Sequence, residues 1–257
     1  MQPPSAHDTP LPPITLIGAG RVGSSLAAAL TAAGATATTV GRDGLEAACA
    51  DAEVALLCVP DEELAAAAAR IATVTPGPRF IGHTSGATPL SALAGAGVAS
   101  AFSVHPLQTI PARGTDLTGA PAAVAGTDPG AEELAAAIAE RCGMVPFAVP
   151  EESRAAYHAA AAIASNFLVA LGSSAESLLE AGGIADGREL LAPLVLRTAA
   201  NWAEHGPAAL TGPIARGDEA TVAAHIEAIA ATAPELEALY RVLAERTREI
   251  ATAEARR

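Results

Sequence analysis

The sequence predicts an α/β fold in which a doubly wound, mostly parallel sheet is followed by an all-helical C-terminal domain. Residues 14–23 run from a short apolar strand into three glycines and then into a helical stretch. Strand and helix signals keep alternating as far as residue 150. Beyond that point the strand signals end and a helical period of about 3.6 residues continues. These three observations together predict a two-part chain.

The glycine-rich turn has the pattern of a Rossmann dinucleotide-binding loop. Gly18 permits the tight turn, Gly20 lets the backbone approach a pyrophosphate, and Gly23 lets the helix pack against the strand. The N-terminus of the following helix offers free amides and a positive dipole end to phosphates. A chance glycine turn is the alternative. The predicted cofactor contacts in this loop are Gly18, Ala19, Gly20, Arg21, Val22 and Gly23.

The end of the second strand indicates which dinucleotide binds. NAD-binding proteins place an acidic residue there to hold the ribose hydroxyls, whereas this chain has Arg42. A planar guanidinium suits the 2′-phosphate of NADP, so the sequence favours NADP(H). Asp43 follows, where it could cap a helix instead. The alternative for Arg42 is a solvated loop charge.

The remaining elements set the expected domains. Residues 53–60 form a continuous apolar run typical of a buried parallel strand, and the acidic residues from Asp61 open an alanine-rich helix. Further strands are expected over residues 79–83, 98–104, 120–125 and 144–149. The predicted domains are a disordered N-terminal arm over 1–13, an NADP-binding domain over 14–150, and a helical substrate and dimerisation domain over 151–257.

Composition excludes several kinds of chemistry. The net charge is −13, and all 15 basic residues are arginine, so no lysine is present for a Schiff base, a general acid or a P-loop. The acidic balance argues against nucleic acid or an anionic membrane as a partner. Six scattered histidines and three unpaired cysteines predict no metal site and a reducing, cytoplasmic location.

Polar turns follow three successive strands, where ligands of open α/β sheets bind. We expect them to form a rim facing the cofactor and the substrate. Turn chemistry independent of function is the alternative, since Ser-Gly and His-Pro both suit loops. The predicted rim contains Val59, Pro60, Asp61, His83 and Ser85 for the cofactor, His105 for catalysis and Gln108 for the substrate.

The helical half adds further candidates. A single buried helix is expected over residues 153–181, not a membrane span, because polar residues interrupt it. Ser165 lies about 20° and Asn166 about 80° from His158 around such a helix. We predict catalytic roles for His158, Ser165 and Asn166, with a buried polar pair as the alternative. The predicted substrate contacts are Tyr157, Thr211 and Arg216, with Arg197 as another carboxylate clamp.

These motifs occur together in a known family. The Gly18-x-Gly20-x-x-Gly23 loop, the His83-Thr-Ser-Gly86 and His105-Pro106 turns, and the Thr211-Gly-Pro segment resemble the Rossmann-like proteins with a C-terminal domain of unknown function 2520. More distantly the chain is similar to pyrroline-5-carboxylate reductase, prephenate dehydrogenase, ketopantoate reductase and deazaflavin-dependent NADP reductase. The resemblance implies NADP in the crevice and a homodimer formed through the helical domain.

One departure affects the predicted mechanism. Related hydroxyacid dehydrogenases place a lysine and an asparagine on the long interdomain helix, and here the lysine is absent. A ketone reductase would then need His158 as proton donor, whereas an iminium substrate would need no strong acid. We therefore expect an NADPH-dependent reductase of a small carboxylated oxo or imino compound, ketopantoate among them. The alternatives are a non-catalytic NADP(H) sensor or scaffold, and a deazaflavin-dependent NADP reductase.

Overall fold

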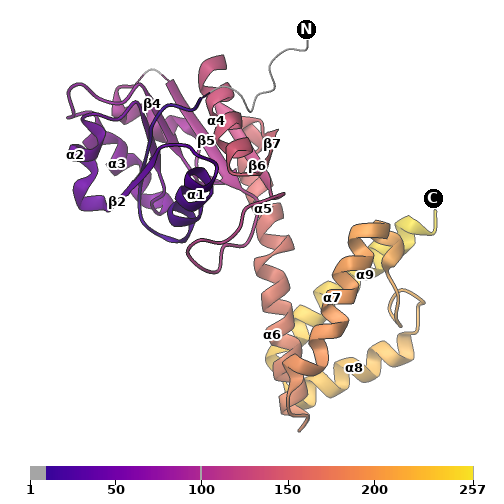
Figure 1. Ribbon diagram of the computed structural model, residues 1–257. Helices are drawn as coiled ribbons and strands as arrows, with labels where there is room; N and C mark the ends of the chain where they lie inside the picture. The colour runs from indigo at the N-terminus through magenta and orange to yellow at the C-terminus, as the bar shows by residue number, and fades with distance from the viewer. Residues whose placement is uncertain (1–9, 99, 257) are drawn as a thin grey trace. The chain divides into compact units, whose positions relative to one another are not determined.

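The computed structural model describes residues 10–98 and 100–256, without the side chain of Arg42. Most of the expected N-terminal arm lies outside these residues. The chain divides into two compact units, Met1–Ala162 and Ile163–Arg257. The first unit thus extends beyond the domain boundary expected at residue 150, and it includes the beginning of the helical region (Figure 1).

Seven strands of the first unit form one sheet in the order β2-β1-β3-β4-β5-β6-β7. Neighbouring strands are parallel except for β5 and β6, which are antiparallel. The expected doubly wound, mostly parallel sheet is confirmed. Its strands are β1 (Ile14–Ile17), β2 (Ala37–Val40), β3 (Val54–Leu57), β4 (Phe80–His83), β5 (Ser100–Pro106), β6 (Pro121–Gly126) and β7 (Val145–Ala148).

Helices cover both faces of this sheet, which explains why the central strands are apolar on both sides. Buried residues of α1 (Arg21–Ala32) and α4 (Pro129–Arg141) join Phe102 and other strand residues in one core cluster. A second cluster on the other face contains Leu57 and buried residues of the remaining helices. Those helices are α2 (Leu45–Cys49), α3 (Leu64–Ile71) and the 3₁₀ helix η4 (Leu90–Ala96).

The strand register brings the predicted polar turns to one edge of the sheet. Ile17 of β1 pairs with Leu57 of β3, Leu57 with His83 of β4, and His83 with Ser103 of β5. The residues that follow these positions therefore leave the sheet side by side. Short 3₁₀ turns follow β2 and β3 at this edge, namely η2 (Arg42–Gly44) and η3 (Asp61–Glu63). A third, η5 (Glu151–Ser153), follows β7, which runs in the opposite direction.

The long helix expected over residues 153–181 is present but interrupted. It consists of α5 (Arg154–Ala164) and α6 (Asn166–Ala181), with Ser165 between them at φ −116° and ψ −71°. The expectation that this segment is buried is wrong, because Val169 is 70% exposed and Phe167 is 55% exposed. The chain itself supplies too few neighbouring side chains to cover this apolar surface.

The same segment is long and apolar enough to cross a membrane, judged by length and composition alone. It spans 31 residues from Glu151 to Ala181, and its most apolar 18-residue window has a mean hydropathy of 1.4 with none of it buried. The cytoplasmic location and the absence of a membrane partner remain predictions.

The second unit consists of helices after α5. An ion pair between Glu176 and Arg188 links α6 to α7, and a 2.7 Å hydrogen bond between His225 Nδ1 and Tyr240 Oη links α8 to α9. Asp218 caps α8 by accepting the N–H of Thr221. The elements are α7 (Gly187–His205), η6 (Gly206–Ala209), α8 (Glu219–Thr232), η7 (Pro234–Leu236) and α9 (Glu237–Glu254).

Candidate functional site

Two glycines of the loop after β1 are required by contacts of the fold itself. Gly18 has φ +114°, and a Cβ there would lie 2.3 Å from the carbonyl oxygen of Cys58. A Cβ on Gly23 would lie 2.0 Å from the carbonyl oxygen of Gly18. Gly20 differs, because a Cβ there would meet nothing within 4 Å. The fold therefore does not need glycine at position 20, which is what a site for close approach of a ligand predicts.

The N-terminus of α1 has the features of an anion site. Gly20 is the N-cap residue and has no side chain to satisfy the first-turn amides, and the first turn of this helix contains no acidic residue. The amides of this turn and the positive end of the helix dipole are thus left for a negatively charged group. Arg21, the first residue of the helix, is exposed.

The end of β2 lies beside the glycine loop. The N–H of Gly18 donates to the carbonyl oxygen of Val40 at 2.9 Å, so the residues that follow Val40 start next to the loop. Arg42 begins η2 at this position, as expected for a residue at the adenosine end of a dinucleotide. Its side chain lies outside the described part of the chain, so its preference for NADP rests on the sequence.

A cavity of about 290 Å³ connects the start of α1 with the polar rim. This volume suits a small ligand group. The predicted residues that the structure brings together here are Arg21, Val22, Asp61, Ser85, His105, Gln108 and His158, and the cavity is completed by Thr84, Gly86, Pro106 and Ile110. Val59 and Pro60 directly follow β3 at the same sheet edge but do not line the cavity.

His105 is the best-supported catalytic candidate in this cavity. Its Nδ1 lies 2.7 Å from the phenol oxygen of Tyr157, and its ring packs edge-on to that of His158 at a centroid distance of 6.0 Å. Burial, and then the neighbouring His158, lower the pKa of His105 to about 4. Burial raises the pKa of Tyr157 to about 12. At neutral pH His105 is therefore uncharged and Tyr157 keeps its proton.

Ser85 takes part in the turn that supports the rim. Its hydroxyl donates to Asp61 Oδ2 at 2.6 Å and accepts the backbone N–H groups of Ala87 and Thr88. The side chain is buried, although the residue lines the cavity. These contacts explain a serine here as a turn residue. Its role in cofactor binding stays a prediction.

His83 does not lie on the rim where the sequence predicted it. The side chain is fully buried, and its Nδ1 accepts the backbone N–H of Ser85 at 3.2 Å. Burial lowers the pKa of His83 to about 4, so the ring is neutral. His83 ends β4, a central strand whose four residues are all buried because helices cover both faces of the sheet. The buried ring of His83 therefore supports the Ser85 turn by accepting the backbone N–H of Ser85.

Arg154 is a residue of this site that the sequence analysis missed. It is 4% exposed, and its guanidinium pairs with Glu151 at 2.8 Å and donates to the hydroxyl of Ser103 and the carbonyl oxygen of Ser85. It holds the start of α5, and with it Tyr157 and His158, against β5. The i, i+3 spacing of an acid and an arginine at a helix start was the available signal.

The other predicted residues belong to the second unit. Ser165 precedes α6, Asn166 is its first residue, and Thr211 and Arg216 lie in the segment before α8. Arg216 is exposed, and its backbone N–H donates within the turn that starts at Gly212. The catalytic and substrate-binding roles of these four residues remain predictions.

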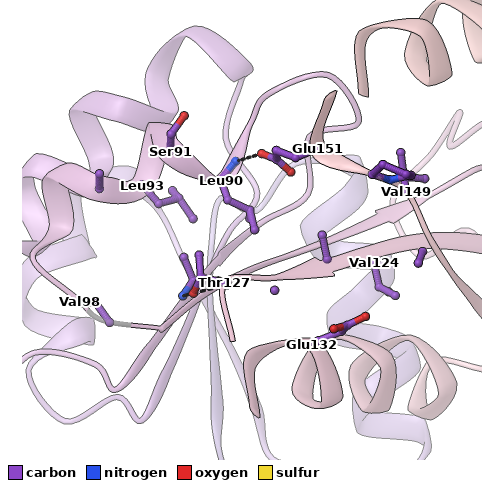
Figure 2. A pocket seen from close by; sticks show the side chains of 15 residues that line it. Leu90, Ser91, Leu93, Val98, Val124, Thr127, Glu132, Val149 and Glu151 are labelled. Carbon is purple, nitrogen blue, oxygen red and sulfur yellow. Dashed lines mark hydrogen bonds between the residues drawn. The ribbon is translucent and has the colours of Figure 1, made fainter. Parts of the chain in front are cut away.

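A larger hollow of about 810 Å³ lies elsewhere in the first unit (Figure 2). It is mostly apolar and is lined by η4, β5, β6 and the segment after β7. The side chain of Glu151 lies beside this hollow, but its carboxylate already accepts hydrogen bonds from the backbone N–H of Leu90 and from Arg154. The predicted histidines His105 and His158 line the smaller cavity beside the glycine loop and not this larger hollow.

Comparison with solved structures supports the fold. A Bacteroides fragilis protein provisionally named an NADP oxidoreductase is 24% identical with a TM-score of 0.79, covering 95% of this chain and 100% of its own. Protein TM1727 from Thermotoga maritima is 23% identical with a TM-score of 0.76 and the same coverage. Pyrroline carboxylate reductase from Plasmodium falciparum, with NADP bound, is 12% identical with a TM-score of 0.59, covering 93% and 98%.

A family model agrees with the resemblance inferred from the motifs. Residues 120–247 match the model described as a domain of unknown function, DUF2520. No curated protein matches the chain. The match begins at β6 and continues through most of the helical region. Residues 120–247 are therefore similar to this family, and they are preceded by the glycine-loop part of a Rossmann-type sheet.

Proposed function

We propose that this protein is an NADP(H)-dependent oxidoreductase that reduces a C=O or C=N group of a small carboxylated compound. The observation that carries the proposal is the cavity in which Arg21 and Val22 of α1 meet His105 and His158. One end of this cavity is formed by the N-terminus of α1, where a phosphate would bind. The other end contains two imidazole side chains that can donate or accept a proton. The site therefore combines cofactor binding with acid–base chemistry.

The residues at the glycine loop fit a dinucleotide. Gly18 and Gly23 shape the loop, Gly20 leaves the approach open, and the first turn of α1 offers unsatisfied amides. NADPH, when bound, supplies a hydride. Arg42 would select the 2′-phosphate of NADP over NAD. Two of the similar structures are named for NADP or contain it, which supports the same choice.

The chain's own groups position the substrate and provide the proton. His105 is neutral and half-buried, so it suits a hydrogen bond to an uncharged group, while the side chain of His158 is exposed to water. Since the chain contains no lysine, His158 takes the role of proton donor in this proposal. Thr211, Arg216 and Arg197 are the proposed contacts for a substrate carboxylate.

Substitution of Gly20 tests the cofactor site with little disturbance of the fold. Gly20→Ala adds a methyl group that meets no protein atom within 4 Å, so the melting temperature should change little. The same methyl group would crowd a pyrophosphate, and we expect NADPH affinity to fall by roughly 10- to 100-fold, about 1.4–2.7 kcal/mol. Gly95→Ala is the matched control, because its added Cβ comes no closer than 3.8 Å to its nearest neighbour, Ala69, and lies away from the loop.

Two further variants separate the alternatives. Arg42→Ser should reduce the preference for NADPH over NADH by roughly 10-fold or more, measured by fluorescence titration, because a charged hydrogen bond contributes about 1.5–3 kcal/mol. His158→Ala should abolish turnover and leave NADPH affinity nearly intact. A wild-type protein that binds neither NADPH nor NADH would overturn the proposal. Binding without turnover of any oxo or imino acid would favour the non-catalytic sensor.

We also propose that the second unit mediates formation of a homodimer. It leaves many large apolar side chains exposed on α6, α7 and α9, among them Val169, Leu196 and Val242. A monomer rarely leaves so much contiguous apolar surface uncovered. A second copy of the same unit offers a matching apolar face, and closed two-fold pairing is the commonest form of self-association.

A further inference from the structure

Gly86, His105 and His158 bound one part of the 290 Å³ cavity, called the gap here, and the two rings lie so close to Gly86 that no side chain fits at position 86. A Cβ on Gly86 would lie 2.8 Å from His158 Nδ1 and 2.9 Å from His105 Nε2, closer than real Cβ atoms come to such neighbours. The two nitrogens come from different elements, β5 and α5, and face the same point. Their separation is less than the sum of those two distances. Because His105 and His158 also line the cavity, a small polar atom held there between the two rings, on the side away from Gly86, can reach both nitrogens.

The hydrogen bond on the far side of His105 determines what its Nε2 presents to this gap. Nδ1 lies 2.7 Å from Tyr157 Oη. A phenol O–H is a stronger donor than a neutral imidazole N–H, and an imidazole nitrogen is a stronger acceptor than a phenol oxygen, so Tyr157 donates to Nδ1. The proton of neutral His105 then lies on Nε2 and points into the gap.

Neighbouring side chains hold Tyr157 and His105 in these positions. The ring of Tyr157 packs edge-on against both His105, at a centroid distance of 5.6 Å, and Phe147, at 6.0 Å. Burial keeps Tyr157 protonated, because its pKa rises to about 12. The buried Arg154 anchors the helix turn before it. Tyr157 is thus a positioning residue that acts through His105.

We propose that Gly86, His105 and His158 form a subsite for the oxygen of a substrate C=O group, with Tyr157 setting the tautomer of His105. The proposal rests on the proposed function and deepens it, because it selects oxo over imino substrates. A carbonyl oxygen accepts the Nε2–H of His105 and a second hydrogen bond from an N–H at His158 Nδ1. An iminium N–H is itself a donor and finds no acceptor on His105.

The tautomer can be tested on the free protein, without cofactor or substrate. In histidine labelled with nitrogen-15, long-range proton–nitrogen spectra at pH 7 distinguish the two neutral tautomers and the imidazolium. We expect His105 to show the Nε2–H form in the wild type and a mixture of tautomers in Tyr157→Phe. A dominant Nδ1–H form, or a charged ring at pH 7, would overturn the proposal.

Filling the gap tests the subsite. Gly86→Ala should move the ring resonances of both His105 and His158, lower kcat/KM for the best 2-oxo acid at least 10-fold, and leave NADPH affinity within about 2-fold. Gly95→Ala should change none of these. The clash at position 86 involves ring atoms alone among the nearest neighbours, so the fold has room to adjust, and the melting temperature monitors this. Unchanged kcat/KM in folded Gly86→Ala would overturn the subsite.

The substrate class is tested with defined probes. Pyruvate, 2-oxobutyrate and ketopantoate represent oxo acids, and 1-pyrroline-5-carboxylate represents imines, each titrated in the presence of NADP. We expect at least one oxo acid to shift the His105 Nε2 resonance, an effect lost in Gly86→Ala. Reduction of the imine alone would overturn this inference and leave the proposed function standing. Failure of the wild type to bind NADP(H) would instead overturn the proposed function.

Discussion

The two units bury their apolar side chains to very different degrees. The first unit surrounds its sheet with helices on both faces and buries large residues such as Phe102 completely. In the second unit, among the described residues, the buried apolar side chains are Val222, Ile229, Ala233 and Ala244. Of the fourteen exposed large apolar side chains described, all but Val145 belong to the second unit.

This difference follows from how each unit is built. A sheet brings distant segments side by side, and two helical layers then cover both of its faces. A set of amphipathic helices has no such central layer, so each apolar face needs another helix as cover. The comparison teaches that the first unit buries its large apolar side chains within itself, whereas the second unit leaves most of those described exposed.

A pair of truncations at one buried and one exposed site would test this contrast most strongly. Phe102→Ala removes a fully buried ring from the sheet core and should lower the free energy of unfolding by about 3–5 kcal/mol. Leu196→Ala, at a side chain that is 71% exposed, should cost less than about 0.5 kcal/mol at dilute, monomeric concentrations. Urea unfolding followed by circular dichroism measures both.

The same two variants also distinguish a side chain that is buried within one chain from a side chain that is buried by a second copy of the chain. If a second copy buries Leu196, the cost of Leu196→Ala should increase with protein concentration, whereas the cost of Phe102→Ala should not. Equal costs at every concentration would contradict the contrast between the units.

The buried histidines of the first unit predict a loss of stability in acid. The folded pKa values of His83 and His105 are lowered to about 4, below the unfolded value near 6.5. The unfolded chain therefore binds more protons between these values, so stability should fall as pH drops from about 6.5 to 4 and then level off. Each histidine should contribute on the order of 2 kcal/mol to this loss.

Comparison of variants isolates the histidine contribution from that of the carboxylates. His105→Gln should lose less stability than the wild type between pH 7 and pH 4.5 in urea titrations. His205→Gln, at a second-unit side chain that is 54% exposed, should behave like the wild type. A wild-type pH dependence that His105→Gln leaves unchanged would show that His105 titrates normally.

Charged substitutions of exposed apolar residues test the proposed homodimer, and they have the smallest expected effect on free energy. Val169→Asp, at a 70% exposed position of α6, should raise the dissociation constant of the dimer by roughly 30-fold, about 2 kcal/mol. Val145→Asp, at a 59% exposed position of β7, should leave it unchanged. Size-exclusion chromatography with light scattering measures both.

Two other outcomes of the dimer experiment would change the interpretation of the exposed apolar side chains. If the wild-type protein is monomeric at all concentrations, self-association is not what covers the exposed apolar side chains of the second unit. Recovery of the wild type in a detergent-dependent fraction, lost in Val169→Asp, would point to a membrane surface, since the segment from Glu151 to Ala181 is long and apolar enough for one.

Much of the first unit could be predicted from the sequence. The strand, glycine turn and helix at residues 14–32 are local features, and the structure has β1, the loop and α1 there. His105 and His158 were both expected at the site, and both line the cavity. The expected position of His83 on the rim was wrong, because a turn pattern does not reveal that the last residue of the strand before it is buried.

The sequence by itself determined the order of elements, the glycine loop and the absence of lysine, because these depend on neighbouring residues or on composition. The tertiary structure decided which side chains meet. His105 and Tyr157 are 52 residues apart and touch only because β5 and α5 pack together, and the rings of His105 and His158 meet beside Gly86 for the same reason. Burial also depends on the whole fold, so it decided that Arg154 is a buried anchor and that the apolar faces of the second unit are exposed.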